Sequence, residues 1–325
     1  MSQLRLNPLT GRWVTLSTDR AMRPGGFAPR NPSVESEPGR PCPFCPGHEE
    51  STPPALETYG QEGQWLVRVV PNLYPAFEGD EALAAEHLGP VFTQARASGI
   101  HEVLVLAREH DSHWADIGER QAGLVMAALR DRFEEHARRP NVRYTQAIVN
   151  HGREAGASIA HPHGQLLGMP FVPGELAEEL AGFVRFGEAC LLCTTVEAEL
   201  GSGHRVVLDS ERAVVIAPYW SGVPYEMLVV PRAHDAHINH ADPKALVAVG
   251  HALRDALGRL RRAVGDVAYN VVFHTAPHHH RDPAYHWHAH VFPRLTSVAG
   301  FEQGTGVLIN LVTPEHATRH LTAAD

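Results

Sequence analysis

The chain has 325 residues, of which 43% are hydrophobic and 20% charged, a composition typical of a soluble globular protein with room for two domains. Its formal charge of -9 argues against a nucleic-acid-binding protein that works through a broad basic face. No uncharged apolar stretch approaches the ~18 residues of a membrane helix, and the N-terminus has no secretory h-region, so we expect a cytoplasmic protein that does not bind membranes.

The first 60 residues are rich in proline, glycine and arginine, and RAMRPGGFAPRNP (20–32) among them predicts an ordered arm or loop with little regular structure. The four cysteines occur as two CxxC pairs, one shortly after this segment and one near the middle of the chain: Cys42, Cys45, Cys190 and Cys193. No cysteine is left over and the chain has 23 histidines, so the pairs favour Zn²⁺ over a disulfide framework or a redox motif.

The elements expected after the arm occur twice in the same order. An apolar strand ends at His110 or His234, an amphipathic helix follows, and β-rich segments lead to a His-x-His strand. The second helix is predicted to begin at Asp242 and Pro243, a good N-cap and first-turn pair. Because regular βαβ alternation is missing, this order predicts the α+β class, with two domains that each combine an antiparallel sheet with one long helix.

The sequence itself also repeats. Three pairs of segments match in order: HEVLVLAREH (101–110) with YEMLVVPRAH (225–234), ALRD (128–131) with ALRD (252–255), and HPHGQ (161–165) with HWHAH (286–290). The period is too long for a solenoid repeat. We therefore expect two tandem domains, residues 1–172 and 173–325, joined where two prolines and a glycine interrupt the pattern at 169–175. The run HHH at 278–280 is expected in a solvated loop.

HPHGQ is the segment with the strongest chemical signal. In a strand, His161, His163 and Gln165 would lie on one side, either as a polar face exposed to water or, after the small-residue loop EAGAS, as a phosphate site. Neutral imidazole can attack phosphorus, and a glutamine can donate a hydrogen bond to a phosphoryl oxygen but cannot deliver a proton. That combination suits a phosphate leaving group and favours transfer over hydrolysis.

Together, CPFCPG, RAMRP, NHGREAGASIAHPHGQ and FHTAP…HWHAHVFP resemble galactose-1-phosphate uridylyltransferase, of the histidine-triad superfamily, along nearly the whole chain. The resemblance implies two tandem histidine-triad-like domains and a homodimer. It also implies that His163 is the nucleophile, which becomes uridylylated, and that Gln165 holds the transferred phosphoryl group. His288, the repeat counterpart of His163, is not expected to be a nucleophile, because the loop with Asn150 precedes only the first copy.

The resemblance further implies a set of substrate-binding residues. Some match positions near the uridine and its phosphates: Asn72, Asn150, Gly156 and Ser158. Arg20 and Arg23 match arginines of an arm that reaches substrate phosphates across the dimer interface, and Glu302 matches a hexose contact.

Metal sites are implied in both halves. The structural zinc of the family would be bound in the first half by Cys42, Cys45, His110 and His161. For the second half we favour a second zinc at the equivalent set, Cys190, Cys193, His234 and His286. Family members with a different second metal suggest another set, with zinc or iron, at Glu179, His274, His288 and His290. The two sets could coexist, and a metal-free polar cluster is the alternative.

The resemblance implies a ping-pong transferase. UDP-glucose would uridylylate His163 and release glucose 1-phosphate, and galactose 1-phosphate would then accept the uridylyl group to give UDP-galactose. One alternative is an ADP-sugar or dinucleotide phosphorylase or adenylyltransferase of the same superfamily, since relatives with two Cys2His2 sites include such enzymes. The other is a non-catalytic, zinc-stabilised nucleotide-binding protein.

Overall fold

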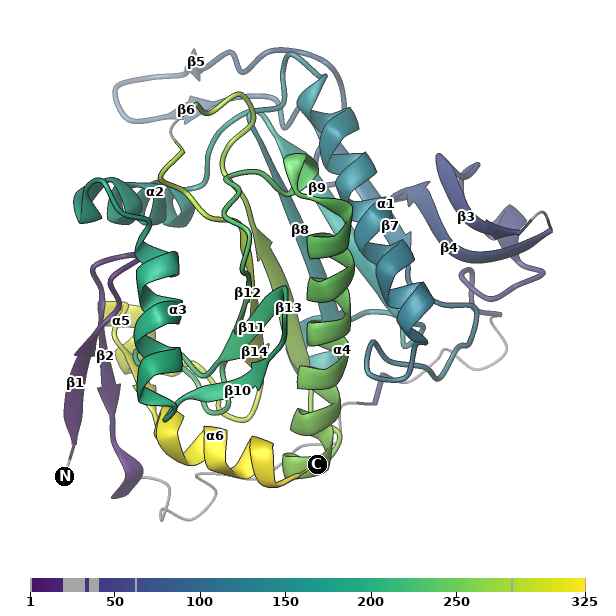
Figure 1. Ribbon diagram of the computed structural model, residues 1–325. Coiled ribbons are helices and arrows are strands. Elements are labelled where there is room, and N and C mark those ends of the chain that lie inside the picture. The colour runs from purple at the N-terminus through teal and green to yellow at the C-terminus, as the bar shows by residue number, and fades with distance from the viewer. Residues whose placement is uncertain (1, 20–32, 35–40, 62, 282, 325) are drawn as a thin grey trace.

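In the computed structural model, which describes residues 2–19, 33–34, 41–61, 63–281 and 283–324, ten strands form one antiparallel sheet across both halves of the chain (Figure 1). Its spatial order is β3-β4-β7-β9-β8-β13-β14-β12-β11-β10. The strands of the first half are β3 (Glu57–Gln61), β4 (Gln64–Pro71), β7 (Ile100–Val105), β8 (Tyr144–His151) and β9 (His163–Met169). Those of the second half are β10 (Val206–Asp209), β11 (Ala213–Ile216), β12 (Met227–Pro231), β13 (Tyr269–His274) and β14 (His288–Pro293).

The strand order of the second half mirrors that of the first, as the sequence repeat predicts. The expected α+β class is confirmed, but the halves share one sheet in place of one sheet each. β8 and β13 meet at its centre, where Asn150 lies opposite Asn270. This pairing hydrogen-bonds the backbone N–H and C=O groups of two strand edges that would otherwise be free to bind another chain.

Two long helices, α1 (Glu119–Ala137) and α4 (Pro243–Val264), cover one face of the sheet side by side (Figure 1). α4 begins where the sequence predicts, because the Asp242 side chain accepts a hydrogen bond from the backbone N–H of Lys244 and proline occupies the first turn. Apolar side chains of both helices and of the strands beneath them form a single core, with members such as Val125, Leu253 and Val271. The helices therefore tie the two halves together on this face.

The opposite face differs between the halves. In the second half, α2 (Gly174–Phe186) and α3 (Leu191–Ser202) contribute to a core on the other side of the same strands, with Leu192, Ile216 and Leu228. In the first half, loop residues such as Phe44 and Ile159 pack there against Val103. Since loops fill this face less completely than helices do, it can hold a ligand pocket.

The remaining strands and helices lie outside the large sheet: β1 (Gln3–Leu6), β2 (Trp13–Leu16), β15 (Leu308–Asn310), β5 (Glu86–His87), β6 (Thr93–Gln94), α5 (Gly300–Thr305) and α6 (Pro314–Ala323). β1, β2 and β15 make a three-stranded sheet, and β5 pairs with β6. Among the helices of the described residues, none is long and apolar enough to span a membrane.

Two local predictions were wrong. β7 and β12 end at Val105 and Pro231, several residues before His110 and His234, so both histidines lie in the following loops. The HHH run lies in a loop, as predicted, but its predicted solvation is wrong for His278, because this side chain is buried and its Nε2 lies 2.8 Å from Thr145 Oγ1. A buried hydrogen-bond partner supplied by a distant strand cannot be read from local composition.

Candidate active site

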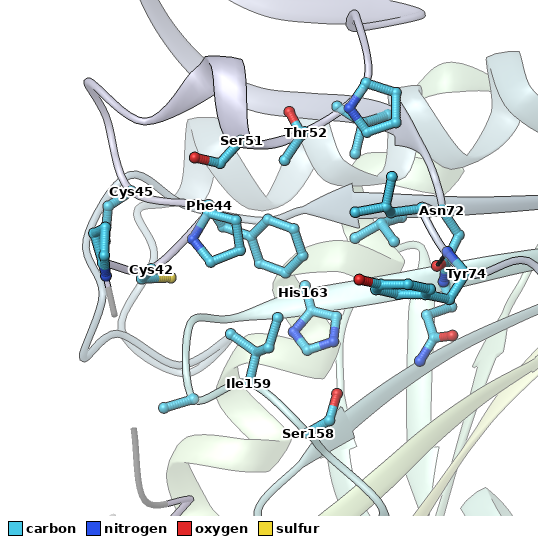
Figure 2. Close-up of a pocket in the computed structure, with 18 of the residues that line it drawn as sticks. Cys42, Phe44, Cys45, Ser51, Thr52, Asn72, Tyr74, Ser158, Ile159 and His163 are labelled. Atoms are coloured by element: carbon cyan, nitrogen blue, oxygen red, sulfur yellow. Dashed lines mark hydrogen bonds between the residues drawn. The ribbon is translucent and has the colours of Figure 1, made fainter. Parts of the chain in front are cut away.

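The pocket on the first-half face has a volume of about 840 Å³ (Figure 2). Its lining includes four of the expected catalytic and substrate-binding residues, Asn72, Ser158, His163 and Gln165, together with three of the expected metal ligands, Cys42, Cys45 and His110. The His163 ring lies within it, near Phe44 and Ile159 (Figure 2). The pocket is therefore large enough for a nucleotide-sized ligand and mostly apolar, with a few polar groups that could orient a ligand.

His163 opens β9 and is only 6% exposed. Its Nδ1 lies 2.8 Å from the backbone oxygen of His161. Because a carbonyl oxygen can only accept, Nδ1 carries the hydrogen and Nε2 keeps its lone pair. Burial lowers the pKa of His163, so the ring is neutral at pH 7. The side chain thus has the tautomer and the protonation state of a nitrogen nucleophile.

Gln165 shares the strand face of His163, and its Oε1 lies 2.8 Å from His101 Nε2. The Asn72 side-chain nitrogen lies 3.1 Å from the same ring nitrogen. The side chain of His101, on β7, therefore lies beside two pocket amides. Sequence reasoning missed it, because HEVLVL was interpreted only as an apolar strand and a lone histidine beside such a run gives no chemical signal.

The small-residue loop between β8 and β9 makes a tight turn over Arg153–Ala155. Gly156 closes this turn at φ 86°, a left-handed conformation that favours glycine. Asn270, from the second half, donates from Nδ2 to Asn150 Oδ1 at 2.7 Å and to the Ala155 carbonyl at 2.8 Å. Asn270 was also missed by sequence reasoning, although its place opposite Asn150 follows from the mirrored strand order.

Other expected substrate residues lie elsewhere. Asn150, near the end of β8, and Gly156, in the loop just described, do not line the pocket, whereas Ser158 does. Glu302 is in α5, does not line the pocket, and its Oε2 accepts a hydrogen bond from the Ala299 backbone at 3.0 Å. Arg20 and Arg23 lie outside the described residues.

The first expected metal set comes together beside the pocket: Cys42, Cys45, His110 and His161. Cys45 Sγ lies 3.4 Å from His110 Nδ1 and 3.6 Å from His161 Nδ1. Tetrahedral zinc with ordinary bond lengths requires ligand atoms about 3.5 Å apart. His161 Nε2 lies 2.8 Å from the Ala107 carbonyl, so Nε2 carries the hydrogen and Nδ1 is free to bind a metal. These residues fit a tetrahedral ion.

The equivalent set of the second half is also assembled: Cys190, Cys193, His234 and His286. Cys193 Sγ lies 3.5 Å from Nδ1 of both His234 and His286. His234 Nε2 lies 2.6 Å from the Pro283 carbonyl, which again leaves Nδ1 unprotonated. The donor types and distances match those of the first set.

The Glu/His set forms a separate cluster: Glu179, His274, His288 and His290. Glu179, from α2, lies 2.9 Å from His274 Nδ1 and 3.4 Å from His288 Nε2. Burial alone would raise the pKa of Glu179, but His274 and His288 hold it below the ordinary value of a carboxyl. A buried carboxylate among three imidazoles is a donor set that zinc or iron can use. The second half therefore contains both sets, each assembled as a cluster of its own.

His288 repeats the local geometry of His163, with its Nδ1 2.8 Å from the His286 carbonyl. However, it is fully buried, and its Nε2 lies 3.1 Å from His290 Nε2 and next to Glu179. α2 supplies Glu179, which lies against His288 at the second-half position that corresponds to the pocket of the first half. A ligand can therefore reach His163 but not His288.

The chain resembles known proteins along its whole length. Residues 1–173 match the family model of the N-terminal domain of galactose-1-phosphate uridyl transferase, and residues 98–324 match a domain of unknown function, DUF4921. The chain is 32% identical to ADP-glucose phosphorylase of Arabidopsis thaliana, over 98% of this chain and 91% of the relative. It is 26% identical to galactose-1-phosphate uridylyltransferase of Thermotoga maritima, over 99% and 98% of the two chains. The crystal structure of the Arabidopsis thaliana ADP-glucose phosphorylase with bound ADP-glucose superimposes with a TM-score of 0.84 at 29% identity and covers 99% of each chain.

Proposed function

Because the chain belongs to the galactose-1-phosphate uridyl transferase family, whose members are nucleotidyltransferases, we propose that it transfers a nucleotidyl group from a nucleoside diphosphate hexose through His163. The observation that carries the proposal is the His163 ring, held in the Nδ1–H tautomer in a pocket large enough for a nucleotide. His163 Nε2 attacks the α-phosphorus, a P–N bond forms, and the P–O bond to the hexose phosphate breaks. The hexose 1-phosphate leaves as an anion that needs little proton assistance.

In the second half-reaction a phosphate oxygen of the acceptor attacks the same phosphorus. The P–N bond breaks, and its electron pair returns to His163 Nε2. The Gln165 amide donates a hydrogen bond to a non-bridging oxygen in both steps, which stabilises the charge that develops there. His163 Nδ1–H stays hydrogen-bonded to the His161 carbonyl throughout.

Zinc in the two Cys2His2 sets would fix the segments that carry these ligands, and the Glu/His set would hold zinc or iron. In the first half, Cys42, Cys45 and His110 would hold His161, whose carbonyl orients the nucleophile. The metal role proposed here is therefore structural: it positions His161 and takes no part in the transfer itself.

An ADP-hexose is the donor we favour, with inorganic phosphate as the acceptor, so that the products are hexose 1-phosphate and ADP. The similarity to ADP-glucose phosphorylase supports this choice, as does the second Cys2His2 set. Uridylyl transfer from UDP-glucose to galactose 1-phosphate is the second candidate, supported by the family model over residues 1–173. For either reaction we propose the two domains 1–172 and 173–325 and a homodimer, in which Arg20 and Arg23 reach substrate phosphates and Glu302 contacts the hexose.

Intact-protein mass spectrometry after incubation with ADP-glucose or UDP-glucose tests the proposal. We expect an AMP adduct from ADP-glucose that inorganic phosphate discharges as ADP. It should disappear in His163→Ala and persist in His204→Ala, a control at an exposed histidine outside the pocket. A UMP adduct discharged by galactose 1-phosphate would establish the second candidate, and no adduct with either donor would reject both.

A further inference from the structure

We propose that His101 is a positioning residue that orients the Gln165 side-chain amide, so that its NH₂ group faces the transferred phosphoryl group. The proposal rests on the proposed function for the nature of the ligand. It rests on the hydrogen bonds around His101 for the orientation of the amide.

The tautomer of His101 is determined by a backbone group. The Ala76 N–H donates to His101 Nδ1 at 3.0 Å. A backbone N–H cannot turn into an acceptor, so Nδ1 must carry the lone pair. In the neutral ring the hydrogen is then on Nε2, which becomes a donor.

That donor determines which way the Gln165 amide points. His101 Nε2 lies 2.8 Å from Gln165 Oε1, and an Nε2–H group pairs only with the oxygen end of the amide. The NH₂ end of Gln165 is therefore left for the pocket that this residue lines. Non-bridging phosphoryl oxygens only accept hydrogen bonds, so the opposite orientation would place oxygen against oxygen.

Asn72 presents a second amide in the same way. Its Oδ1 accepts from the Tyr74 backbone N–H at 2.8 Å, which leaves its NH₂ group 3.1 Å from His101 Nε2. Because Nε2 already carries a hydrogen, it cannot accept from Asn72. The Asn72 NH₂ group thus stays available as a second donor to a ligand in the pocket.

His101 is itself held by the fold. It lies in β7 opposite Leu167, two residues from Gln165 along β9, and its carbonyl accepts from the Asn72 backbone N–H at 2.9 Å. Its position therefore does not depend on a ligand. The Gln165 orientation is set before the substrate binds, which is the condition for electrostatic stabilisation without reorganisation.

Two substitutions of His101 distinguish the roles of its two ring nitrogens. In His101→Asn the amide can replace Nδ1 toward Ala76 but is too short to reach Gln165. In His101→Gln an NH₂ group can replace Nε2. With ADP-glucose in single-turnover experiments, we expect His101→Asn to slow adduct formation on His163 by about 10- to 100-fold and His101→Gln by only a few-fold. The dissociation constant measured with ADP should change little in either variant.

If His101 acts through Gln165, the effects of substitutions at the two residues must depend on each other. In a Gln165→Ala background, His101→Asn should cause no additional loss of rate, because the group that it orients is gone. Equal additional losses in both backgrounds would overturn the proposal. A wild-type rate of adduct formation in His101→Asn would also overturn it. Melting curves of the variants show whether a slower rate comes from loss of folded protein.

NMR of ¹⁵N-histidine-labelled protein tests the orientation independently of activity. The His101 signals, assigned by their absence from the His101→Asn spectrum, should show a protonated Nε2 and an unprotonated Nδ1. The opposite tautomer would overturn the proposal even in an active enzyme. A wild-type protein that forms no adduct would reject the proposed function, while the tautomer would still decide whether His101 orients Gln165.

Discussion

Gly164, between His163 and Gln165 in the central strand β9, allows a direct test of how closely the site depends on strand packing. Its backbone conformation is one that any residue can adopt, so alanine adds no torsional strain there. Space is the constraint. An alanine Cβ at this position would lie 2.9 Å from the Ile148 carbonyl oxygen and 3.2 Å from Val149 Cγ2, both on β8.

Real Cβ atoms essentially never approach a backbone oxygen this closely, so β9 must move away from β8 by about half an ångström to restore contact at about 3.5 Å. Overpacking of this kind costs about 1–3 kcal/mol of folding stability. The same movement displaces His163 and Gln165 on either side. Since a 1 Å misplacement of reacting groups can cost about 100-fold in rate, we expect roughly tenfold slower adduct formation in Gly164→Ala.

The assay is single-turnover formation of the nucleotidyl adduct, followed by mass spectrometry and accompanied by a thermal melt. Gly168→Ala is the matched control, because it lies near the other end of β9 and its Cβ would meet buried neighbours at 3.1 Å or more. Both variants should melt at lower temperature, but only Gly164→Ala should react slowly. A wild-type rate in Gly164→Ala would refute the reasoning that strand spacing positions the nucleophile.

Three further predictions concern metal binding, pH and packing. Cys190→Ser should lower the zinc content by about one equivalent per chain, measured by elemental analysis; unchanged zinc would rule out the Cys2His2 set as a metal site. Burial raises the pKa of Glu226 to about 7, above the value of 4.5 that it has in the unfolded chain. The folded protein therefore binds this proton more tightly than the unfolded chain does, and folding stability falls as pH rises from about 4.5 to about 7. Glu226→Gln removes this loss and should stabilise the protein by up to about 3 kcal/mol at pH 8 but much less at pH 5, by urea titration; equal effects would contradict the assignment. Gly182→Ala, whose Cβ would lie 1.8 Å from the Leu9 carbonyl oxygen, should markedly lower the melting temperature, whereas Gly174→Ala, with no atom within 4 Å, should not.

Local sequence signals predicted much of the architecture. The repeat gave the mirrored elements of the two halves, and the Asp242-Pro243 pair marked the start of α4, because capping depends only on neighbouring residues. The family resemblance implied which Cys and His side chains gather in the first half, and the repeat indicated the equivalent set of the second half, since each half has a CxxC pair and two histidines.

The division of roles between the halves was argued from the loop that precedes His163, but its physical basis lies in the covering of the sheet. His163 and His288 have the same strand position and the same bond from Nδ1 to a carbonyl two residues earlier. Their surroundings differ: Glu179 of α2 lies against His288, and the second residue after the histidine is His290 in place of Gln165. No local pattern encodes which face a helix covers.

The sequence by itself determined the type of each half, because the repeat and the element pattern depend on residue types at short or repeated spacing. Its resemblance to a known family implied the nucleophile hypothesis for His163 and the membership of the Cys/His clusters. The tertiary structure alone decided that one sheet joins the halves, that Asn270 supports the loop of the other half, and that His101 contacts Gln165. It also brought together the Cys2His2 and Glu/His sets of the second half as separate clusters. The physical reason is that these contacts join strands and loops far apart in the sequence, whose pairing follows from burial of the whole sheet and not from any local preference.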